Sequence, residues 1–228
     1  NPTLIISANS TEIKYPETIK LSYTITPDDA TGSVVYYLNG TAVEGDVLRL
    51  LDPGNYVVTA KYEGNDLYNE VDSSNSLSIT VGKCDVSIEV TAANYTIEYG
   101  QNAFLSYYIV PFLATGTIEY YVDGVKTDLL VEGLSVGTHS IAVKFIENVF
   151  YNGAVSETKT LTVTKATPEI TVTANPIAYG QDATITIGLD GVNDEKITGV
   201  VKVTINGKVY DVAVTNGVGT LTVSGLAA

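Results

Sequence analysis

Three copies of one hairpin signal constrain this chain more than any other feature. An Asn-Gly or Asp-Gly pair lies between two runs of β-branched and aromatic residues in residues 33–43, 117–126 and 200–210. Both residues of such a turn adopt positive φ, which suits the twist of paired strands, so the pattern predicts a two-residue hairpin. The glycines at 40, 124 and 207 are 84 and 83 residues apart. We therefore expect a three-fold repeat.

Alternating apolar and polar side chains predict the fold class. In residues 18–26, Ile19, Leu21, Tyr23 and Ile25 alternate with polar residues, which is typical of a strand with one buried face. About seven such strands fit into one complete repeat, the number expected of an immunoglobulin-like (Ig-like) sandwich. The sequence therefore predicts an all-β chain of tandem Ig-like β-sandwiches, with repeats at residues 1–83, 84–166 and 167–228.

The third repeat is shorter than the other two. Residues 225–228 align with residues 133–136 of the second repeat, which precede its last two strands. We therefore expect an incomplete third sandwich without its final two strands. Two explanations stay open: the chain is cut from a longer array, or a neighbouring molecule supplies a strand by augmentation. The second would make the chain a strand-donating subunit of a surface fibre.

One turn in each complete repeat has a specific predicted geometry. Residues 52–56, Asp-Pro-Gly-Asn-Tyr, resemble the tyrosine corner of Ig-like sandwiches, in which the hydroxyl bonds back to the preceding backbone. In the second repeat His139, the chain's single histidine, stands in place of Tyr56. We expect a structural hydrogen bond from His139, because no second histidine is present to complete a usual metal site.

The composition disfavours several functions. The formal net charge of −14 opposes binding to nucleic acid, which needs a basic surface. No run of 18 apolar residues is present, so no membrane insertion is expected within this segment. Cys84 is the single cysteine, so the chain forms no intrachain disulfide.

No catalytic constellation recurs with the repeat, and we expect no enzymatic activity. Acidic pairs such as Asp28-Asp29 lie in turns, where acidic residues favour solubility and turn geometry. No cofactor is expected, with calcium as the one metal worth considering. Oxygen ligands at a repeat junction, such as Asp85 with Glu63 or Asp66, would hold it and stiffen the joint.

Outward-facing tyrosines offer a binding surface. Tyr37, Tyr108 and Tyr121 are predicted to face solvent, where an aromatic strip would stack sugars or pack against a protein. The other interpretation is that tyrosine suits half-exposed strands. Three sequons begin at Asn9, Asn39 and Asn94 and would permit N-glycosylation outside a cell.

The repeats also share short motifs with a known family. These are an aromatic residue followed by Gly or Pro, a glycine before the hairpin, and a stretch that matches the family's Gly-Thr-Tyr strand and the Tyr-x-Gly-Asp-x-x-Tyr loop after it. In this chain Asn65-Asp66 stands for the Gly-Asp step of that loop. These motifs lie at Tyr15-Pro16, Tyr99-Gly100 and Tyr179-Gly180, at Gly32, Gly116 and Gly199, and in residues 54–68. The whole chain resembles the group-3 type of prokaryotic Ig-like repeat. The second repeat departs from the pattern at His139 and at residues 146–149.

The resemblance implies a function, since such repeats occur in tandem in adhesin-like surface proteins of bacteria and methanogenic archaea. We expect structural stalk or spacer repeats of an extracellular cell-surface protein that mediate reach and adhesion. Their partners would be neighbouring repeats and a cell-surface glycan or protein. The alternative is a carbohydrate- or protein-binding module that uses outward tyrosines.

Overall fold

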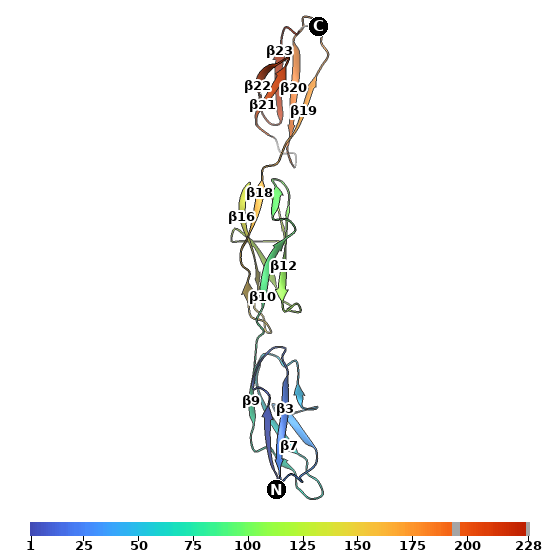
Figure 1. Cartoon of the computed structure of the whole chain (residues 1–228), viewed down its shortest axis with the longest axis vertical. Helices are drawn as coiled ribbons and strands as arrows, with labels where there is room; N and C mark the ends of the chain where they lie inside the picture. Colours follow the sequence, from blue (N-terminus) through green and yellow to red (C-terminus); the bar gives the residue numbers. More distant parts are fainter. Residues whose placement is uncertain (193–196, 227–228) are drawn as a thin grey trace. The chain divides into compact units, whose positions relative to one another are not determined.

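The described part of the chain is built from β-strands. The computed structural model describes residues 1–192 and 197–226, which form the strands labelled in Figure 1 and contain no α-helix. None of these residues belongs to a helix long and apolar enough to cross a membrane. The sheets come in three successive pairs along the sequence.

The first pair of sheets comes from residues 3–82. One sheet has the order β1-β3-β6 and contains β1 (Thr3–Ala8), β3 (Ile19–Thr26) and β6 (Val47–Leu48). The other has the order β2-β9-β7-β4-β5 and contains β2 (Glu12–Lys14), β9 (Leu77–Gly82), β7 (Gly54–Tyr62), β4 (Val34–Leu38) and β5 (Thr41–Val43), with β8 (Val71–Asp72) paired to β7. Only β2 and β9 of these pairs run parallel. This division of strands is that of an Ig-like sandwich.

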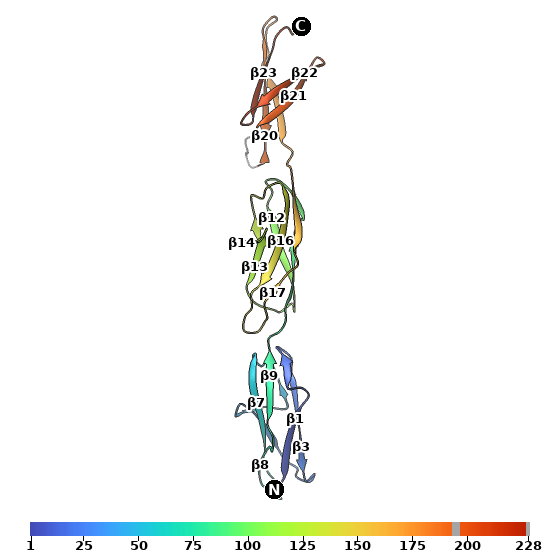
Figure 2. The same cartoon turned by 90° about the vertical axis from the view of Figure 1, so that its left-hand side faces the viewer.

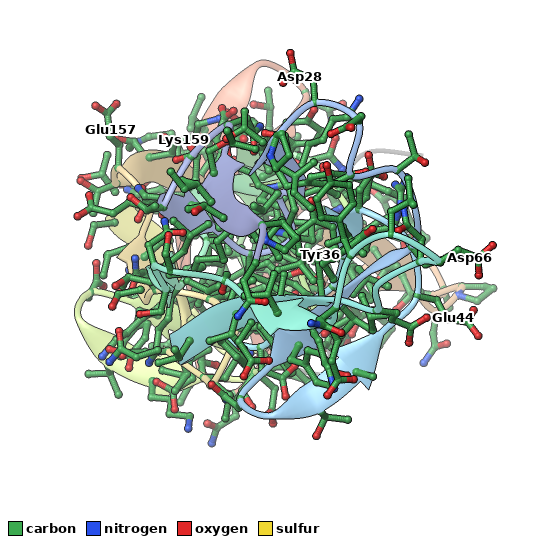
Figure 3. All side chains as sticks on the ribbon, turned by 90° about the horizontal axis from the view of Figure 1, so that it is seen from below. Asp28, Tyr36, Glu44, Asp66, Glu157 and Lys159 are labelled. Atoms are coloured by element: carbon green, nitrogen blue, oxygen red, sulfur yellow. The ribbon has the colours of Figure 1, made fainter. Side chains whose placement is uncertain are left out.

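A single apolar core joins these two sheets. Leu4 and Ile6 of β1 and Leu21 of β3 share one buried cluster with Tyr36 of β4 and Val58 of β7. The alternation predicted from sequence is confirmed in β1 and at Ile19 and Leu21 of β3, whereas Tyr23 on the same predicted face is 44% exposed. Figure 3 shows Tyr36 among other side chains, whereas Glu44 and Asp66 point outward.

The second pair of sheets comes from residues 87–164 and repeats this order. One sheet, β10-β12-β15, contains β10 (Ser87–Ala92), β12 (Ala103–Val110) and β15 (Leu130–Val131). The other, β11-β18-β16-β13-β14, contains β11 (Thr96–Glu98), β18 (Lys159–Thr164), β16 (Gly137–Phe145), β13 (Ile118–Val122) and β14 (Val125–Thr127), with β17 (Ala154–Val155) paired to β16. Tyr107 of β12 and Tyr120 of β13 touch across the two sheets, with ring centroids 6.4 Å apart.

The third pair of sheets is incomplete, as the sequence predicts. One sheet, β19-β20-β23, contains β19 (Glu169–Ala174), β20 (Ala183–Asp190) and β23 (Val218–Val223), and the other contains β21 (Gly199–Ile205) and β22 (Lys208–Val214) alone. Figure 2 shows β21 beside β22. Among residues 197–226 no strand takes the place that β7 and β9 take in the first pair. The fold class is therefore confirmed: all-β, with tandem Ig-like sandwiches and a third that lacks two strands.

The predicted hairpin turns are confirmed in all three repeats. Asn39 and Gly40 have φ of 48° and 82°, and the Asp123-Gly124 and Asn206-Gly207 pairs are similar. Positive φ at both positions is what a two-residue hairpin of this kind requires.

Contacts divide the chain into two compact units. The first contains Asn1–Glu89, Tyr108–Glu119 and Val143–Glu157, and the second contains Val90–Tyr107, Tyr120–Ala142 and Thr158–Ala228. The repeat boundaries at residues 83 and 166 stay a prediction.

Candidate functional site

The tyrosine corner predicted at Tyr56 is present. Tyr56 lies near the start of β7, and its hydroxyl donates a hydrogen bond of 2.8 Å to the carbonyl oxygen of Asp52. The next residue is held by the hairpin, since the Val57 amide donates to Asn39 Oδ1 at 2.8 Å. The corner therefore ties the start of β7 to the turn before it and to the β4–β5 hairpin.

His139 occupies the equivalent corner in the second compact unit. Its Nε2 lies 2.8 Å from the Ser135 carbonyl oxygen, and its Nδ1 lies 2.7 Å from Asp123 Oδ2. Both partners only accept hydrogen bonds, so both ring nitrogens donate and the ring carries a positive charge. The bonds to Ser135 and then to Asp123 raise the pKa of His139, and the bond from His139 lowers the pKa of Asp123. The expected structural role of His139 is confirmed.

A second loop is shared by the two complete repeats although its sequence differs. Asn65 Oδ1 accepts hydrogen bonds from the amides of Leu67 and Tyr68, and its Nδ2 donates to the Thr31 carbonyl. In residues 146–152, Asn148 makes the same bonds, accepting from the amides at 150 and 151 and donating to the carbonyl at 115. The departure from the family motif at residues 146–149 therefore keeps the asparagine that shapes the loop.

The loop of residues 146–152 holds the segment that follows β9, and both belong to the first compact unit. The Cys84 amide donates to the Phe150 carbonyl, and the Asn152 amide donates to the Cys84 carbonyl, each at 2.9 Å. Asp85 accepts a hydrogen bond of 2.7 Å from Asn152 Nδ2 and forms an ion pair with Lys14. The bond from Lys14, followed by that from Asn152, lowers the pKa of Asp85. We call these contacts, together with those of Tyr15 with Phe150 and Tyr151 and of Lys83 with Glu147, the clamped joint.

Aromatic side chains complete the clamped joint. The Tyr15 ring centroid lies 4.8 Å from that of Phe150 and 5.9 Å from that of Tyr151, the latter at an interplanar angle of 88°. Tyr151 is buried. Lys83 and Glu147 add an exposed ion pair. Edge-to-face and tilted ring pairs each contribute about 0.5–1.5 kcal/mol beyond the area they bury, so the rings hold more firmly than the exposed ion pairs.

The structure does not bring the three predicted calcium ligands together. Gly54, at the start of β7, pairs with Val81 near Asp85, while Glu63 and Asp66 follow the other end of β7. The proposed ligand set is therefore wrong, because the antiparallel register separates it along the length of β7. Within residues 1–192 and 197–226 no group of three or more His, Cys, Asp or Glu side chains is placed to hold a metal.

The three predicted binding tyrosines differ in their surroundings. Tyr108 of β12 is 59% exposed, whereas Tyr37 of β4 and Tyr121 of β13 are half-buried. Tyr108 and Tyr121 belong to different sheets, so they do not form one strip. Tyr37 borders a shallow hollow of about 440 Å³ with Lys61 and Asp72. Binding by these tyrosines stays a prediction.

The three sequon asparagines are exposed. Asn9 and Asn39 each use Oδ1 to accept a backbone amide, from Lys20 and Val57. A glycan would join Nδ2, which these bonds do not use. Glycosylation at Asn9, Asn39 and Asn94 stays a prediction.

Sequence reasoning missed a groove in the first pair of sheets. It lies between β3 and the β4–β5 hairpin, has a volume of about 570 Å³, and is bordered by Tyr23, Tyr36 and Asp46. Tyr36 is an inward-facing strand residue, so alternation predicts core and gives no signal of a groove.

Comparisons with known proteins find likeness in structure only. No family model matches the chain, and no curated protein matches it. The solved adhesin FdeC of Escherichia coli aligns over 98% of this chain and 87% of its own, with 14% identity and a TM-score of 0.35. A segment of titin aligns over 99% and 88%, with 14% identity and a TM-score of 0.39. The fibronectin(III)-like modules of Clostridium thermocellum CbhA cover 71% and 95%, with 15% identity and a TM-score of 0.31. The fold assignment rests on the chain's own sheet order.

Proposed function

We propose that the chain provides structural stalk or spacer repeats of an extracellular, adhesin-like cell-surface protein, with repeats at residues 1–83, 84–166 and 167–228. The clamped joint is the observation that carries this proposal. A segment of few residues follows β9, and the loop of residues 146–152 bonds to its Cys84 amide and carbonyl, its Asp85 carboxylate and its Lys83 side chain. A joint of this kind transmits force and orientation from one sandwich to the next, which a spacer needs and a free linker does not provide.

The surface and the loop motifs fit the same proposal. The net charge of −14 makes repeats repel one another, which favours the solubility of a tandem array. The shared asparagine loops and the two corners favour the group-3 type of prokaryotic Ig-like repeat as the family.

Small-angle scattering of the intact chain tests the spacer proposal. We expect the chain to have a larger maximum dimension than a compact protein of 228 residues. We also expect Tyr15→Ala to change this maximum dimension, because the substitution loosens the clamped joint. A scattering profile of a compact globule would contradict the proposal.

The third pair of sheets favours a second candidate function, assembly by strand addition. Ile170 and Val172 of β19 are 56% and 58% exposed, whereas their counterparts Ile88 and Val90 of β10 are 7% and 0% exposed. An apolar face next to an unpaired strand edge is a template for an added strand.

Sedimentation velocity over a range of concentrations tests this second function. Strand addition predicts that oligomers or fibres grow as the concentration rises. Ile170→Lys should abolish them, because it places a charge on the exposed apolar face. A chain that stays monomeric, with a protease-sensitive third pair of sheets, would remove this function and leave the spacer proposal untouched.

A further inference from the structure

A tyrosine groove in the first compact unit has a composition that the spacer role does not require. The groove opens between β3 and the β4–β5 hairpin, and its volume of about 570 Å³ is in the range of small-molecule sites, about 300–1,000 Å³. Tyr36 and Tyr23 supply aromatic surface, Val34 and Val43 apolar surface, and Asp46 a carboxylate. We refer to it as the Tyr36 groove.

Tyr36 itself is the residue that points to a ligand. Its side chain is 4% exposed, yet its hydroxyl bonds to no other residue in the described part of the chain. Every fully buried polar side-chain atom in the described part of the chain has a hydrogen-bond partner. Because the Tyr36 hydroxyl has none, it is not fully buried and has access to solvent. Because Tyr36 borders the groove, we infer that its hydroxyl meets solvent there. A deeply buried phenol therefore presents an unused donor and acceptor to the groove.

Two further polar residues, Tyr23 and Asp46, border the same groove. Burial raises the pKa of Tyr36, and Tyr23 and Asp46 raise it further by their charges. The Asp46 backbone is fixed at this spot, because its carbonyl accepts the Leu21 amide at 2.7 Å. The groove thus combines two phenols and a carboxylate on a rigid backbone.

The second compact unit lacks this combination although it keeps the tyrosines. Tyr107 and Tyr120 take the places of Tyr23 and Tyr36, and their rings pack at 6.4 Å. Leu129 takes the place of Asp46, since its carbonyl accepts the Leu105 amide at 2.8 Å. A tyrosine pair is therefore enough for the sandwich, and the carboxylate beside the Tyr36 groove has no structural counterpart.

We propose that the Tyr36 groove binds a neutral pyranose sugar. A pyranose has an apolar C–H face, which packs on a phenol ring, and hydroxyls around its edge, which exchange hydrogen bonds with phenols and a carboxylate. A cationic ligand fits less well, because Lys20 also borders the groove. The inference goes beyond the spacer role and uses residues other than the three predicted binding tyrosines.

The test is a titration of the intact, isotope-labelled chain by NMR. The probes are the methyl glycosides of mannose, glucose, galactose and N-acetylglucosamine, each at about 20 mM. A ligand as small as a methyl hexopyranoside is expected to bind with a Kd of about 1 mM, which this concentration saturates. We expect at least one probe to shift the resonances of Tyr23 and Tyr36, and none to shift those of Tyr107 and Tyr120.

Three variants separate the groove from its surroundings. Tyr36→Phe keeps the ring and removes only the hydroxyl, and Asp46→Leu installs the residue of the second unit; each should weaken binding about tenfold or more. Tyr120→Phe is the matched control and should leave the Kd unchanged. A dispersed spectrum for Tyr36→Phe confirms that the variant folds.

Several outcomes would overturn the proposal. These are no shift with any of the four glycosides, shifts centred on Tyr37 or Tyr121 in place of Tyr36, and full affinity in folded Tyr36→Phe. Choline that shifts Tyr23 and Tyr36 when no glycoside does so would also overturn it, because the groove would then select a cation. None of these outcomes bears on the spacer role.

Discussion

His139 and Asp123 form a charged pair, 2.7 Å between Nδ1 and Oδ2, at the corner where Tyr56 and Asn39 stand in the first pair of sheets. Both corners return a side-chain hydrogen bond to a backbone carbonyl four residues earlier. The histidine corner also needs a proton on each ring nitrogen, and the tyrosine corner does not. The two corners therefore differ in how they respond to pH.

The His139 corner should weaken as the pH rises. The pKa of His139 is raised in the folded chain, so its contribution to stability is fully present below the unfolded value of about 6.5 and is lost as the pH rises through the folded pKa. Hydrogen bonds to charged groups contribute about 1.5–3 kcal/mol, which sets the upper scale of the loss. His139 is the single histidine, so its ring resonances report the folded pKa directly in an NMR titration.

Replacing the histidine provides the control for that titration. His139→Tyr restores the corner residue of the first repeat and should remove the loss of thermal stability that sets in as the pH rises above about 6.5. A folded pKa of His139 at or below its ordinary value would contradict the charged corner.

The Tyr56 corner should contribute a modest, pH-independent amount to stability. Tyr56→Phe removes one hydrogen bond to the Asp52 carbonyl and keeps the ring, so we expect a loss of about 0.5–1.5 kcal/mol in urea unfolding. Tyr108→Phe, at an exposed strand position, is the matched control and should change stability little. Equal effects of the two variants would mean that the corner bond stabilises nothing.

Gly116 should tolerate no side chain. A Cβ at this position would lie 2.6 Å from Cζ of Phe145, whose side chain is fully buried. Gly116→Ala should therefore cost about 1–3 kcal/mol, measured by thermal unfolding. At the equivalent Gly199, no atom of residues 1–192 or 197–226 lies within 4 Å of such a Cβ, so Gly199→Ala should be close to neutral. A neutral Gly116→Ala would show that the loop around it relaxes.

Much of the fold was predictable because its signals are local. The Asn-Gly and Asp-Gly turns, the alternation through Tyr36, and the corner at Tyr56 each follow from a few neighbouring residues. The missing strands of the third sandwich follow from aligning the repeats. These features need no knowledge of how distant segments meet.

The sites were less predictable because they depend on register between distant segments. Asp85 was expected beside Glu63 and Asp66, but it follows β9 near the start of β7, whereas they follow the end of β7. Lys14 and Asn152 bond to Asp85 instead. The role of Asn148 was hidden because the residues around it differ from those around Asn65. The Tyr36 groove was missed because strand alternation predicts that an inward-facing tyrosine belongs to the apolar core.

The most direct test of the spacer account is whether the clamped joint is stiff. Residual dipolar couplings of amides in residues 3–82 and 143–157 measure this in the intact chain. The account predicts one common alignment tensor, which splits into two in Tyr15→Ala because the ring contacts with Phe150 and Tyr151 are lost. Tyr179→Ala, at the exposed equivalent position, should leave a single tensor. Two independent tensors in the unmodified chain would contradict the account.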